Sequence, residues 1–249
     1  MLAIAVLRGL PFSLSRRDVV IFALLGIVNQ TAYLGLSYVG IRSISSGLAA
    51  LVISANPVLT AVLAAVFLDD PMTWRKGIGL VLGIGGVAFV VDGRLAGGVE
   101  DPVGIGFTIL ALISLVSGTI LFKKFTPTGD LWIGNTVQSI AAGIGTLPFA
   151  LAFENVGEVV PSWRLMASLA YLALFVSIFA YLLWFHLLNV SGATAASSYH
   201  FLMPPLGMLF GWLLLGEHVA LVDLLGMVPV AVGIYLVTRP SRSLEGDAP

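Results

Sequence analysis

The sequence contains no cysteine and few charged residues, and both absences narrow its chemistry. Without cysteine the chain has no disulfide, no thiol nucleophile and no thiolate metal site. Charged residues make up 10% of the 249 positions, whereas a soluble domain carries about 25%. Hydrophobic residues make up 58%, and the mean hydropathy is +1.03. This composition excludes a soluble protein and predicts that a lipid bilayer surrounds the chain.

The chain also lacks the features of nucleic-acid binding and of membrane enzymes. Its formal net charge is −1, and its basic residues lie between apolar segments rather than in a patch, so we expect no nucleic-acid partner. The three histidines, His186, His200 and His218, have no acid partner at metal-ligand spacing. No serine has a recognisable general base. We therefore expect no catalytic residue, no metal and no cofactor, and an intramembrane enzyme is the least favoured alternative.

Apolar segments divide the chain into eight predicted membrane-spanning helices. A helix needs about 20 apolar residues to cross a bilayer. The third span is short, and we expect it to begin within the preceding turn. Residues 1–7 are too few to span, and residues 239–249 are predicted to form a disordered cytoplasmic tail. The predicted spans are 19–39, 47–68, 77–91, 102–122, 131–153, 165–188, 194–215 and 220–238.

Basic residues in the short loops predict the orientation in the membrane. If successive loops alternate sides, nine basic residues fall on one side and only three, Arg42, Arg94 and Arg164, fall on the other. The excess of Lys and Arg marks the cytoplasmic side. We therefore expect a multi-pass protein of the cell (plasma or inner) membrane with its C-terminus in the cytoplasm.

One pattern occurs twice, at 49–91 and again at 196–238, with an offset of 147 residues. The copies agree at a helix-breaking proline and at two glycines, where backbone geometry restricts the choice of residue. Five crossings separate equivalent helices, and an odd number means that the copies have opposite orientations. This predicts an inverted repeat, with a substrate site near the bilayer midplane. The identical pairs are Ala49/Ala196, Pro57/Pro204, Leu59/Leu206, Leu68/Leu215, Gly79/Gly226, Val81/Val228, Gly86/Gly233 and Val90/Val237.

The ends of the proline helices complete a family resemblance. The first ends in an acidic turn, Leu68-Asp69-Asp70, and the second in Leu215-Gly216-Glu217; a glycine-rich helix follows each. These features resemble the EamA branch of the drug/metabolite transporter (DMT) superfamily. The resemblance implies an all-α polytopic membrane protein with an inverted five-plus-five helix repeat. It also implies export of amino acids, other metabolites or drugs, so the expected partners are a small-molecule metabolite and the lipid bilayer.

The repeat offset predicts that the chain lacks the first helix and most of the second of these ten helices. Residues 1–92 are then a truncated first repeat, and 102–238 are a complete second repeat. A non-transporting membrane fragment or assembly partner is the alternative to a transporter.

In the family, the central pathway is lined by the first, third, fourth, sixth, eighth and ninth helices. The resemblance assigns this lining to an absent helix and to the spans that begin at Val19, Gly47, Pro102, Leu165 and Thr194.

Polar side chains in the first span are candidates for the substrate pathway, because polar groups are costly in hydrocarbon. Asn29, Tyr33 and Ser37 recur at helical spacing, with Gln30 beside them and Gly26 one turn earlier, so we expect them to share one face. Amide groups at this depth can hydrogen-bond a polar or zwitterionic metabolite. The alternative role is hydrogen bonding between helices.

A second predicted polar and aromatic face lies on the span 165–188. It carries Ser177, Tyr181 and Trp184, and its aromatic surface suits a flat or apolar substrate. The alternative for Trp184 is an aromatic belt at the membrane interface.

Prolines are predicted to break two of the spans. Pro57 and Pro204, with Pro205 beside the second, remove backbone hydrogen bonds at a cost on the order of 3 kcal/mol unless neighbours compensate. Broken helices in transporters expose backbone groups to the substrate, whereas a packing kink is the alternative. The polar candidates near these prolines are Ser54, Asn56, Tyr199 and His200.

No carboxylate lies in the middle of a predicted span, so the buried acid typical of proton-driven pumps is missing. His200 is the candidate for a proton relay near neutral pH, with a neutral structural imidazole as the alternative. Asp70 and Glu217 are predicted to cap the helices that follow them, with substrate contact as the alternative. The acids at span ends are Asp69, Asp70, Glu217 and Asp223.

Overall fold

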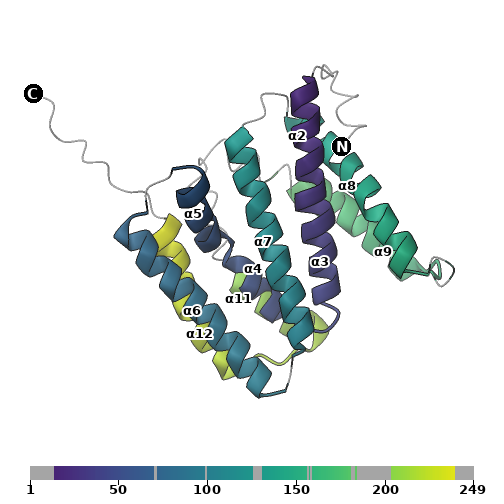
Figure 1. Cartoon of the computed structure of the whole chain (residues 1–249). Coiled ribbons are helices and arrows are strands. Elements are labelled where there is room, and N and C mark those ends of the chain that lie inside the picture. The colour runs from purple at the N-terminus through teal and green to yellow at the C-terminus, as the bar shows by residue number, and fades with distance from the viewer. Residues whose placement is uncertain are drawn as a thin grey trace, which may run out of the picture.

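The computed structural model describes residues 14–69, 72–98, 100–125, 131–155, 157, 159–180, 183 and 203–238. These residues form a bundle of tilted helices (Figure 1), and no strand occurs among them. The elements are α2 (Arg16–Gly26), the π-helix η1 (Ile27–Ala32), α3 (Tyr33–Gly40), α4 (Ser46–Ser54), α5 (Asn56–Phe67), α6 (Trp74–Ala96), α7 (Pro102–Phe125), α8 (Leu131–Phe153), α9 (Trp163–Tyr171), the π-helix η3 (Leu172–Ala180), α11 (Met203–Leu215) and α12 (Leu221–Thr238).

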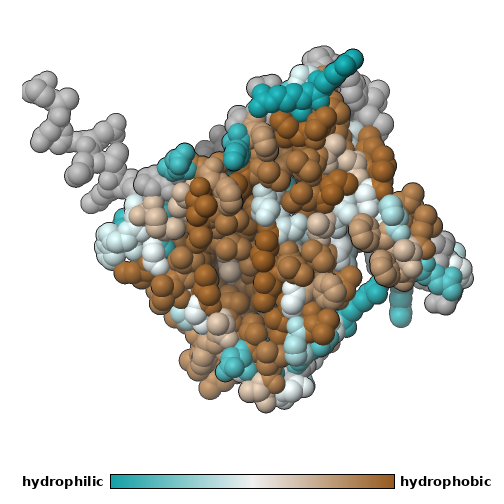
Figure 2. Space-filling view, in the orientation of Figure 1, coloured by the Kyte–Doolittle hydropathy of each residue, from teal (hydrophilic) through white to brown (hydrophobic). Residues whose placement is uncertain are grey.

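Six helices in the described part are long and apolar enough to cross a membrane, and they match six of the eight predicted spans. The prediction of a polytopic all-α membrane protein is therefore confirmed. Two shorter apolar helices overlap the other two spans, namely Trp163–Ser177 and Met203–Leu215. Figure 2 shows a broad hydrophobic surface across the middle of the bundle, with hydrophilic residues gathered toward its ends. The six are Arg16–Gly40, Ser46–Phe67, Trp74–Ala96, Pro102–Phe125, Trp132–Phe153 and Leu221–Thr238.

The third span is longer than its apolar run. Thr73 caps α6, because its side chain accepts a hydrogen bond from the Lys76 N–H at 3.3 Å. The helix therefore begins in the preceding turn, as predicted. It continues past the predicted end to Ala96 and includes Arg94. The prediction that Arg94 lies in a loop is wrong, because acidic partners surround this side chain in place of water.

The second span is interrupted in its middle. α4 ends at Ser54 and α5 begins at Asn56, with Ala55 in a turn between them. The Ala55 N–H donates to the Val52 carbonyl at 3.1 Å. Pro57 follows in the first turn of α5, where its missing N–H leaves no helical hydrogen bond unmade. α4 is the most enclosed element, with seven of its nine residues buried.

α6 and α12 lie side by side as antiparallel helices (Figure 1). A Cβ at Gly79 would lie 2.6 Å from the Gly233 carbonyl oxygen, and a Cβ at Gly86 would lie 2.9 Å from the Gly226 carbonyl oxygen. The sequence offset relates Gly79 to Gly226 and Gly86 to Gly233, so each glycine contacts the counterpart of the other. This exchange of contacts is the pattern that a two-fold relation between the copies would give. We call these four residues the α6–α12 seam.

Candidate functional site

The first span carries a π-helix at its centre, and this feature recurs in the second half of the chain. η1 covers Ile27–Ala32, and the equivalent residues, 174–179, lie inside η3 (Leu172–Ala180). π-Helices hold well under 1% of residues in proteins and are frequent at functional sites. Their coincidence at equivalent positions marks the middle of both spans as a candidate site, although no sequence pattern predicted it.

Two polar atoms of the first span, Asn29 Oδ1 in η1 and Ser37 Oγ in α3, are buried without a partner among the described residues. The Asn29 amide lies against Gly118 of α7, where any Cβ would overlap it. One turn away, the Ser114 hydroxyl of α7 donates to the Val28 carbonyl at 2.8 Å. Leaving a polar group without a hydrogen-bond partner in hydrocarbon costs roughly several kcal/mol of free energy. These two atoms therefore have hydrogen-bonding capacity that water or a polar solute would satisfy.

The predicted common face of the first span is not continuous. Gly26 packs against the Gln138 backbone of α8, and the Thr31 hydroxyl donates to the Ala142 carbonyl of α8 at 3.0 Å. Asn29 instead faces α7. The prediction that Gly26 shares the Asn29 face is wrong, because the i→i+5 turns of η1 hold more residues than α-helical turns and shift the side-chain directions.

The remaining candidates of the first half differ in their surroundings. Tyr33 is half-buried and packs against the main apolar core. Gln30 is also half-buried. At the α4–α5 break, the fully buried Ser54 donates to the Leu51 carbonyl at 2.6 Å. Asn56 Oδ1 accepts a hydrogen bond from the Thr60 hydroxyl at 2.9 Å. Unlike Asn29, neither Ser54 nor Asn56 is left unpaired.

The candidates of the second half are less concentrated. Ser177 is exposed within η3, so it does not share the buried environment of the Asn29 side-chain oxygen. Pro204 is buried and Pro205 is exposed, both in the first turn of α11 as described. The other candidates lie outside the described residues: Tyr181, Trp184, Tyr199 and His200.

A buried ionic network that was not among the sequence predictions lies at one end of the bundle. Arg94, near the end of α6, donates from Nε to Asp223 Oδ1 at 2.8 Å and from Nη2 to the second oxygen of the same carboxylate. Its Nη1 donates to Glu100 Oε1 at 3.2 Å. Arg94, Glu100 and Asp223 are each at most 9% exposed. A buried charge is tolerated when it is paired and hydrogen-bonded, so these three residues depend on one another.

Two acids at this end bind the N-terminus of α4. Glu100 accepts hydrogen bonds from the Ser45 N–H at 2.9 Å and from its hydroxyl at 2.7 Å. Glu217 accepts from the Ser46 N–H at 2.8 Å, from its hydroxyl at 2.9 Å and from the Gly47 N–H at 3.3 Å. A helix N-terminus carries partial positive charge and unpaired N–H groups, so carboxylates stabilise it.

The prediction that Glu217 caps the helix after it is therefore wrong. Glu217 caps α4, which lies 171 residues earlier in the chain. Gly216, at φ +68°, ends α11 in the left-handed conformation and turns the chain toward α4. Asp223 instead caps the start of α12, because it accepts a hydrogen bond from the Ala220 N–H at 2.7 Å.

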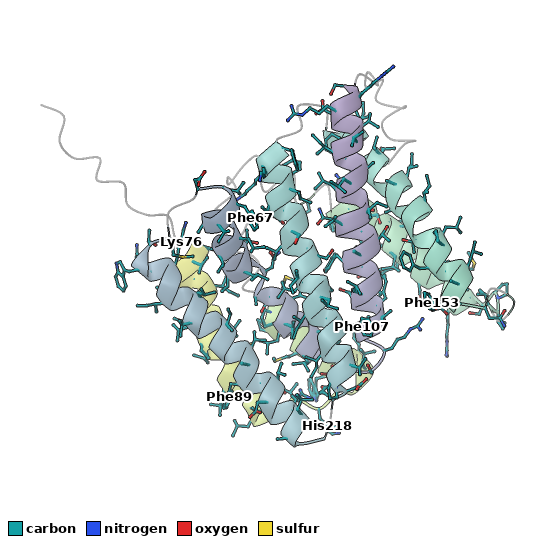
Figure 3. The ribbon with its side chains drawn as sticks, in the orientation of Figure 1. Phe67, Lys76, Phe89, Phe107, Phe153 and His218 are labelled. Atoms are coloured by element: carbon teal, nitrogen blue, oxygen red, sulfur yellow. The ribbon has the colours of Figure 1, made fainter. Side chains whose placement is uncertain are left out.

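We call the end that holds Arg94, Glu100, Glu217 and Asp223 the network end. Figure 3 shows His218 there, at the end of the bundle opposite to Phe67 and Lys76. A pocket of about 330 Å³ opens beside the network. Among the described residues, no group of three His, Asp or Glu side chains is arranged to hold a metal ion. The residues that line the pocket are Arg42, Ser43, Ile44, Ser45, Arg94, Glu100, Glu217 and His218.

One signal in the sequence pointed to this network. The loops predicted to lie outside the cytoplasm carry few basic residues, yet the acids Glu100 and Glu217 fall there and Asp223 lies in the first turn of the span that follows. An arginine among several acids at the ends of apolar segments indicates ion pairing. Counting only basic residues, as the orientation rule requires, discards this information.

The chain matches the model of the EamA-like transporter family over residues 1–92 and 102–239. It is similar to an uncharacterized transporter of Archaeoglobus fulgidus, with 29% identity over 220 residues that cover 88% of this chain and 77% of that protein. Protein PecM of Dickeya dadantii is 27% identical over 215 residues, 86% of this chain and 71% of PecM. A probable terminal-alkyne amino-acid exporter of Streptantibioticus cattleyicolor is 28% identical over 252 residues, 99% of this chain and 82% of that protein.

The predicted resemblance is thus confirmed over nearly the whole sequence. The helical bundle, its six long apolar helices and the match over both segments agree on one class of protein. The chain belongs to the EamA-like transporter family of multi-pass membrane transporters.

Proposed function

We propose that the protein exports or exchanges a small metabolite by alternating access through a central pathway between two inverted repeats. The observation that carries this proposal is the family match over both segments of the chain. The recurrence of a π-helix at equivalent positions of the two segments supports it. One similar protein is named an amino-acid exporter, which favours an amino acid-like substrate over the drug-like alternative.

The contacts of the α6–α12 seam support the repeat on which this mechanism depends. In our proposal residues 1–92 and 102–238 are the two repeats, and their glycine helices meet across the two-fold relation. In alternating access one repeat or bundle rocks against the other around a fixed site, and we propose that the α6–α12 seam stays in contact during this movement. The orientation with a cytoplasmic C-terminus, in the cell membrane, belongs to the same proposal.

Asn29 is the residue that we place in the pathway with most support. Its carbonyl oxygen is buried without a partner in the described part of the chain, and a solute ammonium or hydroxyl group would satisfy it. Truncation at this position therefore removes no hydrogen bond of the described structure. Asn29→Ala is expected to leave the melting temperature nearly unchanged.

Flux into or out of proteoliposomes tests the proposal. The purified protein is reconstituted and offered a panel of labelled amino acids, amino-acid analogues and cationic aromatic compounds. We expect saturable flux of at least one amino acid-like compound, reduced about tenfold by Asn29→Ala because a lost hydrogen bond to a charged group has this magnitude. Ser117→Ala is the control and should transport normally, because the half-buried Ser117 donates only to the Ile113 carbonyl of its own helix, at 2.7 Å. Equal flux for Asn29→Ala and the wild type would remove Asn29 from the pathway, and no flux of any compound would contradict the proposed activity.

A further inference from the structure

α4 and α11 approach each other closely at the network end. A Cβ at Gly207 would lie 2.5 Å from the Ala50 Cβ, and a Cβ at Gly211 would lie 2.7 Å from the Ser46 Oγ. A Cβ at Gly47 would lie 3.3 Å from a side-chain carbon of α11. We call these five residues the α4–α11 seam. No solute passes between two helices packed at this distance, so the bundle is closed along this seam.

Glu217 joins the two helices of the seam. It lies two residues beyond the end of α11, and it accepts three hydrogen bonds from the first two residues of α4. Its Oε2 also fills the space where a Cβ of Gly211 would stand. The carboxylate therefore attaches the second half of the chain to the first half, at the point where the first proline-broken span begins and the second ends.

The hydrogen bonds of Glu217 to α4 can break without a large loss of free energy. Glu217 and Ser46 are half-buried rather than sealed, and the pocket at the network end reaches Glu217. Water can replace each hydrogen bond, so the net free energy holding the contact is modest. By contrast, Arg94 and Asp223 beside it are buried and paired, which keeps the α6 and α12 ends in place.

We propose that Glu217 is a positioning residue that closes the transport pathway at the network end by holding α4 against α11, and that release of its hydrogen bonds opens this end. The inference rests on the proposed function, because it concerns the closing of the same pathway. It can nevertheless be tested without a known substrate, because opening exposes the seam to water whether or not a solute is present.

The absence of cysteine permits a direct test of this closure. A single cysteine placed in the seam, Ala50→Cys, is labelled on intact cells and on inside-out vesicles with a membrane-impermeant maleimide. In the otherwise wild-type chain we expect slow labelling from both faces. Adding Glu217→Gln should raise the labelling rate about tenfold on the face that the network end meets, which the proposed orientation makes the outside of the cell.

Two further variants separate closure from loss of folding. Glu154→Gln removes an exposed acid that pairs with Arg42 at 2.8 Å, and it should leave labelling of Ala50→Cys unchanged. Ser46→Ala removes only the hydroxyl bond to Glu217 and should raise the rate about threefold, since the two N–H bonds remain. The melting temperature of each variant is measured in parallel. Labelling of the Glu217→Gln variant no faster than that of Glu154→Gln would overturn the proposal.

A disulfide across the seam links closure to transport. Ala50→Cys with Gly207→Cys places two Cβ atoms close enough to form a disulfide after a small outward shift. Oxidation should stop the flux of any transported solute, and a reductant should restore it. Undiminished flux through the oxidised, cross-linked protein would overturn the proposal. If the wild type shows no flux, the proposed function fails, while the labelling result still decides whether Glu217 closes the seam.

Discussion

The two halves of the chain meet at two seams that use small residues in the same way but are held by different forces. In the α6–α12 seam the closest groups are glycine backbones, Gly79 against Gly233 and Gly86 against Gly226. In the α4–α11 seam small residues also meet, but a carboxylate hydrogen-bonded to a helix N-terminus completes the contact. The four glycines of the first seam carry no side chain, and the Arg94–Asp223 pair that also joins α6 to α12 is buried. The second seam ends instead in half-buried hydrogen bonds that water can replace.

This difference teaches how one bundle combines a fixed contact with a movable one. The glycines of the α6–α12 seam have no side chain that could form a hydrogen bond with water after the helices separate. Separation of α6 from α12 therefore loses van der Waals contact and gains no new hydrogen bond from a side chain of the seam. Hydrogen bonds at a half-exposed helix end are replaced by water at little net cost. The two seams should therefore respond differently to substitution, and the predictions below are ordered by the size of the expected effect.

Removal of Arg94 should have the largest effect, because it leaves Glu100 and Asp223 buried without a counter-charge. We expect Arg94→Ala to lower the free energy of unfolding by about 3–5 kcal/mol. Adding Asp223→Asn removes one of the uncompensated charges and should recover part of this loss. Thermal unfolding of the purified protein in detergent measures both changes. A loss below about 1 kcal/mol would show that water already reaches this network.

Alanine in the α6–α12 seam should have an intermediate effect that is similar in both halves. Gly79→Ala and Gly226→Ala each place a Cβ against backbone or a packed side chain, and overpacking of this kind costs about 1–3 kcal/mol. Gly85→Ala is the control on the same helix, since a Cβ there meets nothing within 4 Å. Melting temperatures that fall for Gly79→Ala but not for Gly226→Ala would contradict the two-fold relation between the copies.

Removal of the Ser45 hydroxyl should have the smallest effect. It accepts from the Leu48 N–H at 3.3 Å and donates to Glu100 at 2.7 Å, so it is both the N-cap of α4 and a partner of the network. Ser45→Ala should lower the free energy of unfolding by about 1 kcal/mol, as loss of an N-cap does. Ser43→Ala, at an exposed position in the preceding turn, is the control and should be neutral. Equal losses for the two variants would show that the α4 cap contributes little.

Much of the architecture could be predicted because a membrane makes local sequence decisive. An apolar run of about 20 residues must form a helix, since hydrocarbon offers no partner for free backbone groups. The interruption at Ala55, beside Pro57, follows from the same local chemistry. The offset that relates Gly79 to Gly226 likewise needs only the sequence, because glycine is seldom interchangeable where backbones approach closely.

The site was less predictable, because its properties depend on neighbours. Asn29 and Ser37 were found from the cost of polar groups in hydrocarbon, but the π-helix that redirects Asn29 toward Gly118 depends on the packing of α7 and α8. Glu217 was correctly expected at a helix N-terminus, but the wrong helix was assigned. Sequence distance favours the next helix along the chain, and a pair 171 residues apart is not visible in it.

The sequence by itself determined that the protein spans a membrane many times, where most of its spans lie, and which family it belongs to. These properties depend on composition, run length and residue spacing, which are local. Only the tertiary structure decided which charged ends meet: Arg94 with Asp223 and Glu100, and Glu217 with the start of α4. Charges at helix ends can pair with any neighbour within about 4 Å, so their partners are set by how the helices assemble rather than by their order along the chain.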